Sequence, residues 1–355
     1  MNMLINETEI ALTQYSKGAG CGCKIAPKVL EEILAGNLSS SDNHKLIVGN
    51  DYKDDAAVYD LGNGEGLIST TDFFTPIVDD PYDFGRIAAA NAISDVYAMG
   101  GHPLLALAIL GWPVEKLPVS LAKRIIEGAR NICAEAGITL AGGHSIDSQE
   151  PIFGLAVSGR IPLQHVKRNN TSKPGDLIYL TKPIGVGILT TAEKRKQLLP
   201  EHHGIAVGHM SKLNVIGAEL GAMRDVSAMT DVTGFGIGGH LIEMAEGSNV
   251  SVELIWDKVP VITGAVEYLN KKIFPDATSR NWTSFGNKIG FRKGVPVSQA
   301  FMLLPDPQTN GGLLFTVSEV GRSEVEDFLR SNGYEQHAIP IGQIMERGEK
   351  ILQVI

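Results

Sequence analysis

The sequence has few cysteines, no surplus of positive charge and no long apolar run. Three cysteines among 355 residues are too few for a disulfide framework and are typical of a reducing, intracellular environment. Asp and Glu outnumber Lys and Arg by 40 to 31, a net charge of −9, which disfavours nonspecific binding to nucleic acid or anionic membranes. The longest apolar stretch, around residues 103–112, is about half a bilayer span, and the N-terminal residues lack a signal-peptide pattern. We therefore expect a cytoplasmic protein with no membrane or nucleic-acid partner.

Glycine, by contrast, is abundant and clustered. The chain has 40 glycines, above the average share of about 7%. They gather at residues 18–22, 100–101, 142–143, 234–239 and 311–312, and each cluster interrupts an apolar run. This pattern indicates turns where the backbone closely approaches another group, and it is unlike the even spread of a flexible linker.

The length predicts about two domains at roughly 150 residues each. A polar, basic and turn-rich stretch at residues 165–176 is the boundary we expect between them. Residues 1–45 have no convincing long periodic element, so we expect a flexible glycine-rich segment there. It precedes an N-terminal domain over residues 46–165 and a C-terminal domain over residues 166–355.

Short apolar runs alternate with amphipathic stretches in both halves, as in α+β domains. In the first half we expect helices over residues 84–99 and 120–136, and strands over residues 45–48, 56–61, 67–71, 103–110, 138–141 and 152–161. In the second half we expect helices over residues 186–193, 205–223, 237–245, 262–271 and 324–332. The strands expected there cover residues 177–180, 250–256 and 312–317, a short strand ending at Asp231 and two terminal strands.

The run Gly18-Ala-Gly-Cys21-Gly-Cys23-Lys24 is a candidate site for thiol chemistry. Two cysteines in this spacing can be metal ligands, a redox pair, or a nucleophile with a spare. A structural metal site needs about four ligands, and a Cys21–Cys23 disulfide would close a strained ring. We interpret the run as a reactive thiol on a mobile glycine loop, with Lys24 close enough to favour the thiolate. Incidental cysteines in a flexible loop remain the alternative.

Several carboxylates stand beside expected strands or inside an expected helix: Asp54, Asp55, Asp72, Asp95 and Asp231. Asp95 is the most informative, because it shares a face of helix 84–99 with Asn91, four residues earlier. The rest of that helix is small and apolar, and a buried charge without a partner is costly. Mg²⁺ is the natural partner, since it prefers carboxylates together with substrate phosphates. For any single aspartate, a solvated turn or helix surface is the alternative.

Three further glycine-rich motifs are less specific. Ala141-Gly-Gly-His144-Ser145, at the end of a strand, could contact phosphate or ribose through backbone N–H groups, but a plain tight turn fits it equally well. Residues 234–239 match the dinucleotide fingerprint G-x-G-x-x-G, with Glu253 further on. Because Asp231 and Thr233 directly precede that turn, we interpret its glycines as letting helix 237–245 pack tightly. Residues 306–312, taken alone, read as a surface hairpin loop.

The chain also resembles a known family along nearly its whole length. The run Leu12-Thr-Gln-Tyr-Ser-Lys-Gly-Ala-Gly-Cys-Gly-Cys-Lys24 is similar to the N-terminal signature of the selenophosphate synthetase (selenide, water dikinase) family. The likeness extends through Thr70-Thr-Asp-Phe-Phe74, Asn91-Ala-Ile-Ser-Asp-Val-Tyr-Ala-Met-Gly-Gly101, Gly142-Gly-His-Ser-Ile146, Met229-Thr-Asp-Val-Thr-Gly-Phe-Gly236 and Asp306-Pro-Gln-Thr. The family belongs to the aminoimidazole ribonucleotide synthetase superfamily. The resemblance implies a two-domain α+β fold whose N-terminal domain sheets pair across a homodimer, with ATP and Mg²⁺ bound by the N-terminal domain.

The resemblance implies that ATP, selenide and water give selenophosphate, AMP and orthophosphate, the selenophosphate serving as selenium donor for selenocysteine and selenouridine synthesis. It implies essential roles for Cys21 and Lys24, and several Mg²⁺ ions on Asp55, Asp95 and Asp231, with K⁺ commonly required as well. The implied nucleotide contacts are Lys24, Tyr52, Lys53, Asp54, Asp72, Asp95, Gly143, His144 and Ser145. Position 21 carries Cys where some members have selenocysteine, and Asn310 stands where the family often has Ser.

The residue pattern and the resemblance both predict that distant aspartates converge to bind a triphosphate through Mg²⁺, beneath a loop that carries a thiol. Two alternatives remain at this stage. One is an ATP-dependent kinase or cyclase of the same superfamily, which would have no reason to carry the Gly-Cys-Gly-Cys-Lys loop. The other is a noncatalytic thiol carrier of selenium or metal, which would have no use for a triphosphate clamp. The sequence also leaves open whether selenide arrives free or from a delivery protein.

Overall fold

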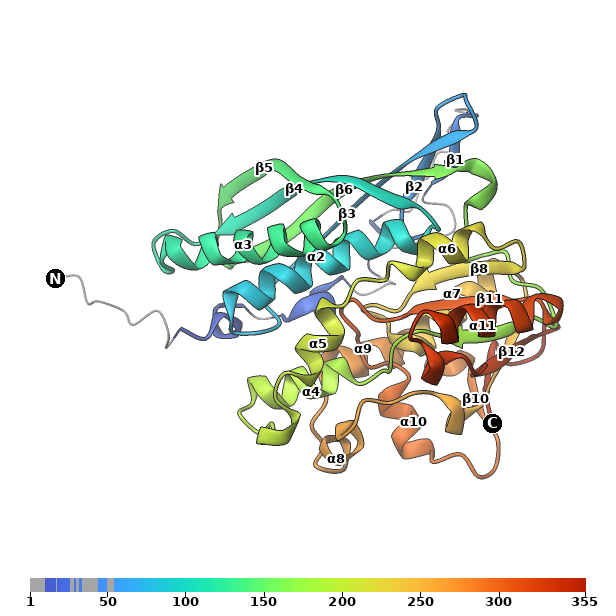
Figure 1. The fold of residues 1–355 in the computed structure, drawn as a ribbon. Coiled ribbons are helices and arrows are strands. Elements are labelled where there is room, and N and C mark those ends of the chain that lie inside the picture. Colours follow the sequence, from blue (N-terminus) through green and yellow to red (C-terminus); the bar gives the residue numbers. More distant parts are fainter. Residues whose placement is uncertain (1–9, 17, 26–28, 30–31, 34–43, 50–53) are drawn as a thin grey trace.

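The first half of the chain forms a mixed six-stranded sheet. The structure is a computed structural model, and it describes residues 10–16, 18–25, 29, 32–33, 44–49 and 54–355. The strand order of this sheet is β1-β2-β3-β6-β4-β5. The strands are β1 (Leu46–Val48), β2 (Ala57–Asp60), β3 (Glu65–Phe74), β4 (His102–Trp112), β5 (Thr139–Asp147) and β6 (Ile152–Pro162). Two helices, α2 (Pro81–Ala98) and α3 (Val119–Glu135), cover one face of this sheet (Figure 1).

Helix α2 is the central element, and its sequence explains why. Asp80 caps its N-terminus by accepting a hydrogen bond from the Asp83 N–H at 2.9 Å. Small residues then allow close packing: a Cβ on Gly85 would lie 1.9 Å from the Ile125 carbonyl oxygen of α3. Every residue from Ile87 to Ala98 is buried, because α2 packs against the sheet and α3 on one side and against the second half of the chain on the other.

The opposite face of the first sheet is open and apolar. The strands alternate, so that Ile68 and Phe74 of β3 face the helices while Leu67 and Phe73 face away. On β4, Leu107 joins this open face at 44% exposure. The open face therefore presents large apolar side chains that no other part of the described chain covers.

The second half of the chain contains a seven-stranded sheet in the order β10-β13-β9-β12-β7-β11-β8. Its strands are β7 (Leu177–Leu180), β8 (Val226–Asp231), β9 (Ser251–Leu254), β10 (Ile289–Phe291), β11 (Leu313–Val317), β12 (Gly342–Met345) and β13 (Leu352–Val354). The helices are α4 (Val186–Lys194), α5 (Ile205–Ser211), α6 (Ile216–Ala222), α7 (Gly236–Gly247), α8 (Ala265–Asn270), α9 (Asp276–Phe285), α10 (Val297–Leu303) and α11 (Arg322–Ser331). Strand β8 lies at the edge nearest α2 (Figure 1). No helix among the described residues is both long and apolar enough to cross a membrane.

The single helix expected over residues 205–223 is wrong, because the chain breaks into α5 and α6. The side chain of Asn310 donates to the carbonyl oxygens of Met210, at 2.6 Å, and Lys212, at 2.9 Å. Asn214 lies in the break, is fully buried and donates to Ser94 of α2 at 2.8 Å. Side chains from distant segments thus replace the helical hydrogen bonds, which no local pattern reveals.

Two more expectations need correction. The Gly142–Ser145 motif does not end a strand, since β5 continues through it to Asp147. Helices α9 and α10 were not expected at all, because their short apolar stripes lie between prolines and polar residues.

The run from Asp306 to Asn310 is also not a surface loop, since Asp306, Gln308, Thr309 and Asn310 are at most 2% exposed. This run holds the N-terminus of α4. Gln308 Oε1 accepts from the N–H groups of Gly185 and Val186 at 3.2 and 3.1 Å. Asp306 Oδ2 accepts from the Gly187 N–H at 3.2 Å. Helix α4 begins here because these side chains satisfy its free N–H groups.

We predict that Asp306 makes the folding stability depend on pH. Its burial outweighs the hydrogen bonds from Gln308 and Gly187 and raises its pKa to about 8, whereas an unfolded Asp titrates near ~3.9. The native state therefore binds the extra proton between these values, and stability falls as pH rises through that window, by up to about 1.4 kcal/mol per pH unit. Asp306→Asn should remove this slope in urea unfolding measured from pH 5 to 8. Parallel wild-type and variant profiles would contradict the assignment.

Candidate active site

Asn91 of α2 joins residues 18–24, which we call the cysteine loop, to the rest of the site. Its Oδ1 accepts from the Cys21 thiol at 3.3 Å and from the Asn310 N–H at 2.7 Å. Its Nδ2 donates to Asp72 Oδ2 at 2.8 Å. Cys21 lies in a 3₁₀ turn, Gly20–Cys23, and its N–H donates to the Thr309 hydroxyl at 3.1 Å. One buried amide therefore connects the thiol, a carboxylate and the 306–310 run.

Lys24 and Asp72 form an ion pair beside the thiol, with Nζ and Oδ2 2.9 Å apart. Burial acts to lower the pKa of Lys24, but nearby negative charge, above all that of Asp72, raises it well above its usual value. Lys24 also acts to lower the pKa of Cys21, as expected, but burial dominates and leaves that pKa raised. With the loop in this position Cys21 is a neutral thiol, so the expectation that Lys24 favours the thiolate holds in direction only.

The three predicted metal-binding aspartates converge between the two halves of the chain. Asp55 precedes β2, Asp95 lies on α2 and Asp231 ends β8. Burial raises all three pKa values, that of Asp231 to about 6, and the charge of Asp231 further raises those of Asp55 and Asp95. Such mutual effects require the carboxylates to lie close together in a poorly solvated space.

Hydroxyl groups hold each of these aspartates. Thr230 of β8 donates to Asp55 at 2.9 Å, Thr70 of β3 donates to Asp95 at 2.6 Å, and Ser94 of α2 donates to Asp231 at 2.5 Å. The Thr230–Asp55 and Ser94–Asp231 hydrogen bonds each join one half of the chain to the other. The two halves are therefore in direct contact at the carboxylates.

The donor set fits a hard divalent cation. Asp55 Oδ2 is buried and has no hydrogen-bond partner in the described part of the chain, and buried like charges require compensation. Hydroxyls and carboxylates supply the oxygen donors that Mg²⁺ prefers. No three Asp, Glu, His or Cys side chains of the described residues are already gathered around one point as a ready-made metal site.

The remaining predicted contacts are placed differently. Asp54 Oδ1 accepts from the Asn169 N–H at 2.8 Å, so it secures the segment after β6. Gly143 lies in the same cross-strand row as Asp72, but three strands away through β6 and β4, or about 14 Å at the usual strand spacing. His144 and Ser145 follow it on this edge strand, so the structure does not bring them to the carboxylates. Tyr52 and Lys53 lie outside the described residues.

Glycines let the loop and helix α7 approach the site. A Cβ on Gly234 would lie 2.7 Å from the Cys21 carbonyl oxygen, and Gly236 has a φ of +69° and faces the Leu304 carbonyl. The G-x-G-x-x-G match therefore serves packing, as expected from Asp231 and Thr233. Its first glycine also makes room for the cysteine loop.

Two residues of the site, Lys182 and Asn310, have roles that the sequence alone did not predict. Lys182 is buried and donates to the carbonyl oxygens of Lys212 and Asn310 at 2.7 and 2.8 Å. Burial lowers its pKa to about 7, although Asp231 acts to raise it. Asn310 has a φ of +48°, a left-handed conformation that Asn adopts more readily than most residues. Its side chain faces the α5–α6 break, and its backbone N–H reaches Asn91. No local signal marks Lys182, whereas the glycines after Asn310 hint at a sharp turn.

Comparison with known proteins places the chain in a family. Residues 53–161 match the model of the AIR synthase related protein, N-terminal domain, and residues 173–355 match that of its C-terminal domain. A thiamine-monophosphate kinase from Stenotrophomonas maltophilia has the same fold at 19% identity, with a TM-score of 0.64 over 94% of this chain and 96% of that one.

Two curated relatives are much closer in sequence. The chain is 54% identical over 339 residues to "Selenide, water dikinase" of Colwellia psychrerythraea, covering 95% of this chain and 96% of the relative. It is 53% identical over 349 residues to the protein of the same name from Photorhabdus laumondii, covering 98% and 99%. At this identity and coverage, and with both domain models matched, the chain belongs to the selenide, water dikinase family of AIR synthase related proteins.

Proposed function

We propose that this chain synthesises selenophosphate from selenide, ATP and water, releasing AMP and orthophosphate. The single observation that carries this proposal is the hydrogen-bonded chain from the Cys21 thiol through Asn91 to Asp72 and Lys24. In this chain of hydrogen bonds a thiol lies beside a cation and a cluster of buried carboxylates. A thiol carrier would not need those carboxylates, and a kinase for another substrate would not need the thiol. The name of both relatives, selenide, water dikinase, agrees with this reaction.

Asp55, Asp95 and Asp231 are the residues we propose to hold Mg²⁺. The bound ions would neutralise the triphosphate and stabilise the charge that develops during phosphoryl transfer. Thr230, Thr70 and Ser94 fix the carboxylates in place before the nucleotide arrives, which lowers the cost of assembling the site. The K⁺ requirement implied by the resemblance stays a prediction.

Lys24 and Cys21 have complementary tasks in this proposal. The Lys24 ammonium group exchanges its contact with Asp72 for contacts with phosphate oxygens. The Cys21 thiol is neutral while buried, and it donates its S–H hydrogen bond to Asn91. When the loop moves, the same S–H group can donate to a selenide anion instead, and so hold or guide the selenium nucleophile without a change of protonation or oxidation state. Return of the loop excludes water from the first transfer, and water enters for the second, hydrolytic step.

Several finer features are also proposals. Tyr52, Lys53, Asp54, Asp72 and residues 143–145 stay predicted nucleotide contacts. The open apolar face of the first sheet supports a homodimer in which two such faces meet, because large exposed apolar surfaces mark interaction sites. A cytoplasmic location, a selenium-delivery partner and the use of the product for selenocysteine and selenouridine synthesis likewise rest on the resemblance.

Cys21→Ala should lower the rate of selenophosphate formation by about 10³-fold or more. Nucleotide binding should stay intact, because the substitution removes only the sulfur. Phosphorus NMR of a mixture of ATP, Mg²⁺ and selenide follows selenophosphate, AMP and ADP together. Cys133→Ala, at a buried position of α3, is the matched control and should keep wild-type turnover. Full activity of Cys21→Ala would refute the role of the thiol, and ADP as the only wild-type product would indicate a kinase.

Asp95→Asn should have opposite effects on stability and on binding. Without metal, the variant should melt at a higher temperature near neutral pH, because burial and the charges of Asp231 and Asp72 raise the pKa of Asp95 and make its ionised form costly. Its affinity for the Mg²⁺–nucleotide complex should fall by at least about tenfold. Calorimetric titration with a nonhydrolysable ATP analogue tests this, with Asp83→Asn in the first turn of α2 as control. Unchanged affinity would remove Asp95 from the metal site.

Leu107→Glu should convert the proposed dimer to monomers, because it places a charge in the centre of the open sheet face. Val119→Glu is the control, since Val119 is 70% exposed but begins α3 on the helical side. Light scattering after size-exclusion chromatography gives the mass of each. A Leu107→Glu dimer as stable as the wild type would place the interface elsewhere.

A further inference from the structure

A cavity of about 420 Å³ lies against the backbone of the cysteine loop. Gly18 and Ala19, before Cys21, and Gly22, after it, line this cavity, as does Thr309. The Cys21 side chain itself faces Asn91, which does not line the cavity. The loop therefore separates the cavity from the buried carboxylates.

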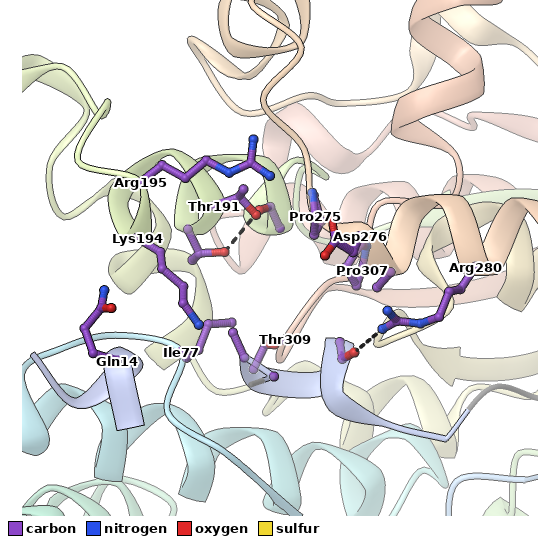
Figure 2. A pocket seen from close by; sticks show the side chains of 16 residues that line it. Gln14, Ile77, Thr191, Lys194, Arg195, Pro275, Asp276, Arg280, Pro307 and Thr309 are labelled. Atoms are coloured by element: carbon purple, nitrogen blue, oxygen red, sulfur yellow. Dashed lines mark hydrogen bonds between the residues drawn. The ribbon is translucent and has the colours of Figure 1, made fainter. Parts of the chain in front are cut away.

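Among the described residues, three cationic side chains line this cavity, although the chain as a whole is acidic. Lys194 and Arg195 reach it from the C-terminal end of α4, and Arg280 reaches it from α9 on the opposite side (Figure 2). Asp276 is the one carboxylate-bearing residue among the described residues that line it, so the lining has a surplus of two positive charges. No carboxylate of the described residues lies within 4 Å of any of the three cationic groups.

The cations also hold the loop. Arg280 Nη2 donates to the Gly22 carbonyl oxygen at 2.9 Å, and Lys194 Nζ donates to the Ser16 carbonyl oxygen at 3.5 Å. Thr309, whose hydroxyl accepts from the Cys21 N–H, also lines the cavity. Two cationic side chains thus contact the backbone around a thiol that is only 1% exposed, so the loop must move before any reagent reaches the sulfur.

Selenide and ATP face different electrostatic conditions at this site. ATP brings divalent cations that offset the carboxylates. Hydrogenselenide, a small monoanion near neutral pH, brings none, and Asp72, Asp95 and Asp231 would repel it on the nucleotide side. A cleft lined with positive charge attracts small anions and raises their local concentration.

We propose that this cavity admits the anionic selenium substrate, hydrogenselenide, to Cys21, and that Lys194, Arg195 and Arg280 attract it. This inference rests on the proposed function, because it assigns the route by which the substrate of that reaction reaches the thiol. When the loop moves away from Asn91, the sulfur reaches the cavity, where the anion is bound beside the three cations.

The first test needs neither selenide nor ATP. Cys21 is alkylated with iodoacetate, an anion, and with iodoacetamide, its neutral counterpart, and peptide mass spectrometry separates Cys21 from Cys23. The thiolate fraction affects both reagents equally and cancels in the ratio of their rates. In Lys194→Gln/Arg195→Gln the iodoacetate-to-iodoacetamide ratio should fall about fivefold at low salt, the size of effect that Coulomb's law gives in water for two unit charges within about a Debye length of the reacting group. Added salt should reduce the wild-type ratio in the same direction.

The control removes two charges from the exposed side of α3, in Lys123→Gln/Arg130→Gln, and should keep the wild-type ratio. A ratio unchanged in the cavity variant, or equally lowered in the control, would overturn the proposal. It would also be overturned if neither reagent modified Cys21, because the thiol would then not be reachable by this route.

The second test uses turnover. At saturating ATP, the KM for selenide should rise about fivefold in the cavity variant, with the KM for ATP near the wild-type value. An equal rise in the KM for ATP would assign the cavity to the nucleotide and overturn the proposal. Weaker inhibition by orthophosphate with an unchanged KM for selenide would assign the cavity to phosphate and would also overturn it. A wild-type protein that makes no selenophosphate would instead defeat the proposed function, while the alkylation ratio would still decide whether anions reach Cys21 through the cavity.

Discussion

Buried like charge is the constraint on which the rest of this structure depends. Asp55, Asp95 and Asp231 come from three distant parts of the chain. Burial raises the pKa of each, and the charge of Asp231 further raises the pKa values of Asp55 and Asp95. Without a counterion such a cluster weakens the fold, because burial of a carboxylate is costly. Hydroxyl donors on β3, α2 and β8 offset part of this cost. The site therefore trades stability of the free protein for affinity toward cations and the polyphosphate they accompany.

Helix α2 explains how one element can serve two domains. Its alanines and glycine pack against α3 and the first sheet, and its polar residues Asn91, Ser94 and Asp95 face the cysteine loop and the second half of the chain. None of these polar groups is left alone: each makes a hydrogen bond to a segment remote in sequence. Because α2 is buried from Ile87 to Ala98, it holds Asn91, Ser94 and Asp95 in fixed positions relative to one another, and the cysteine loop docks on Asn91.

The sequence predicted much of this arrangement, and its failures have physical causes. Apolar periodicity located helices α2 and α3 and most strands, and the pairing of Asn91 with Asp95 on one helix face indicated a buried polar site. The break between α5 and α6 could not be predicted, because Asn310, about 100 residues away, supplies the hydrogen bonds that the helix loses. The burial of residues 306–310 was missed for the same reason: turn residues are usually exposed, and here they cap α4. Lys182 carried no pattern at all, since its two acceptors are backbone carbonyl groups.

The cysteine loop has carboxylates on one side and cationic side chains on the other. This asymmetry matches the two anionic substrates of the proposed reaction, of which only ATP brings divalent cations. On one side lie carboxylates, which are suited to an anion that arrives with its own divalent cations. On the other side lie Lys194, Arg195 and Arg280, which are suited to an anion that arrives with none. A single surface could not attract both forms, since charges that favour one repel the other. The glycine-rich backbone of the cysteine loop separates the two surfaces, so one Cys21 sulfur can reach either side when the loop moves. Glycine suits this position because it has no side chain to block the movement. It also tolerates the φ of +51° found at Gly20.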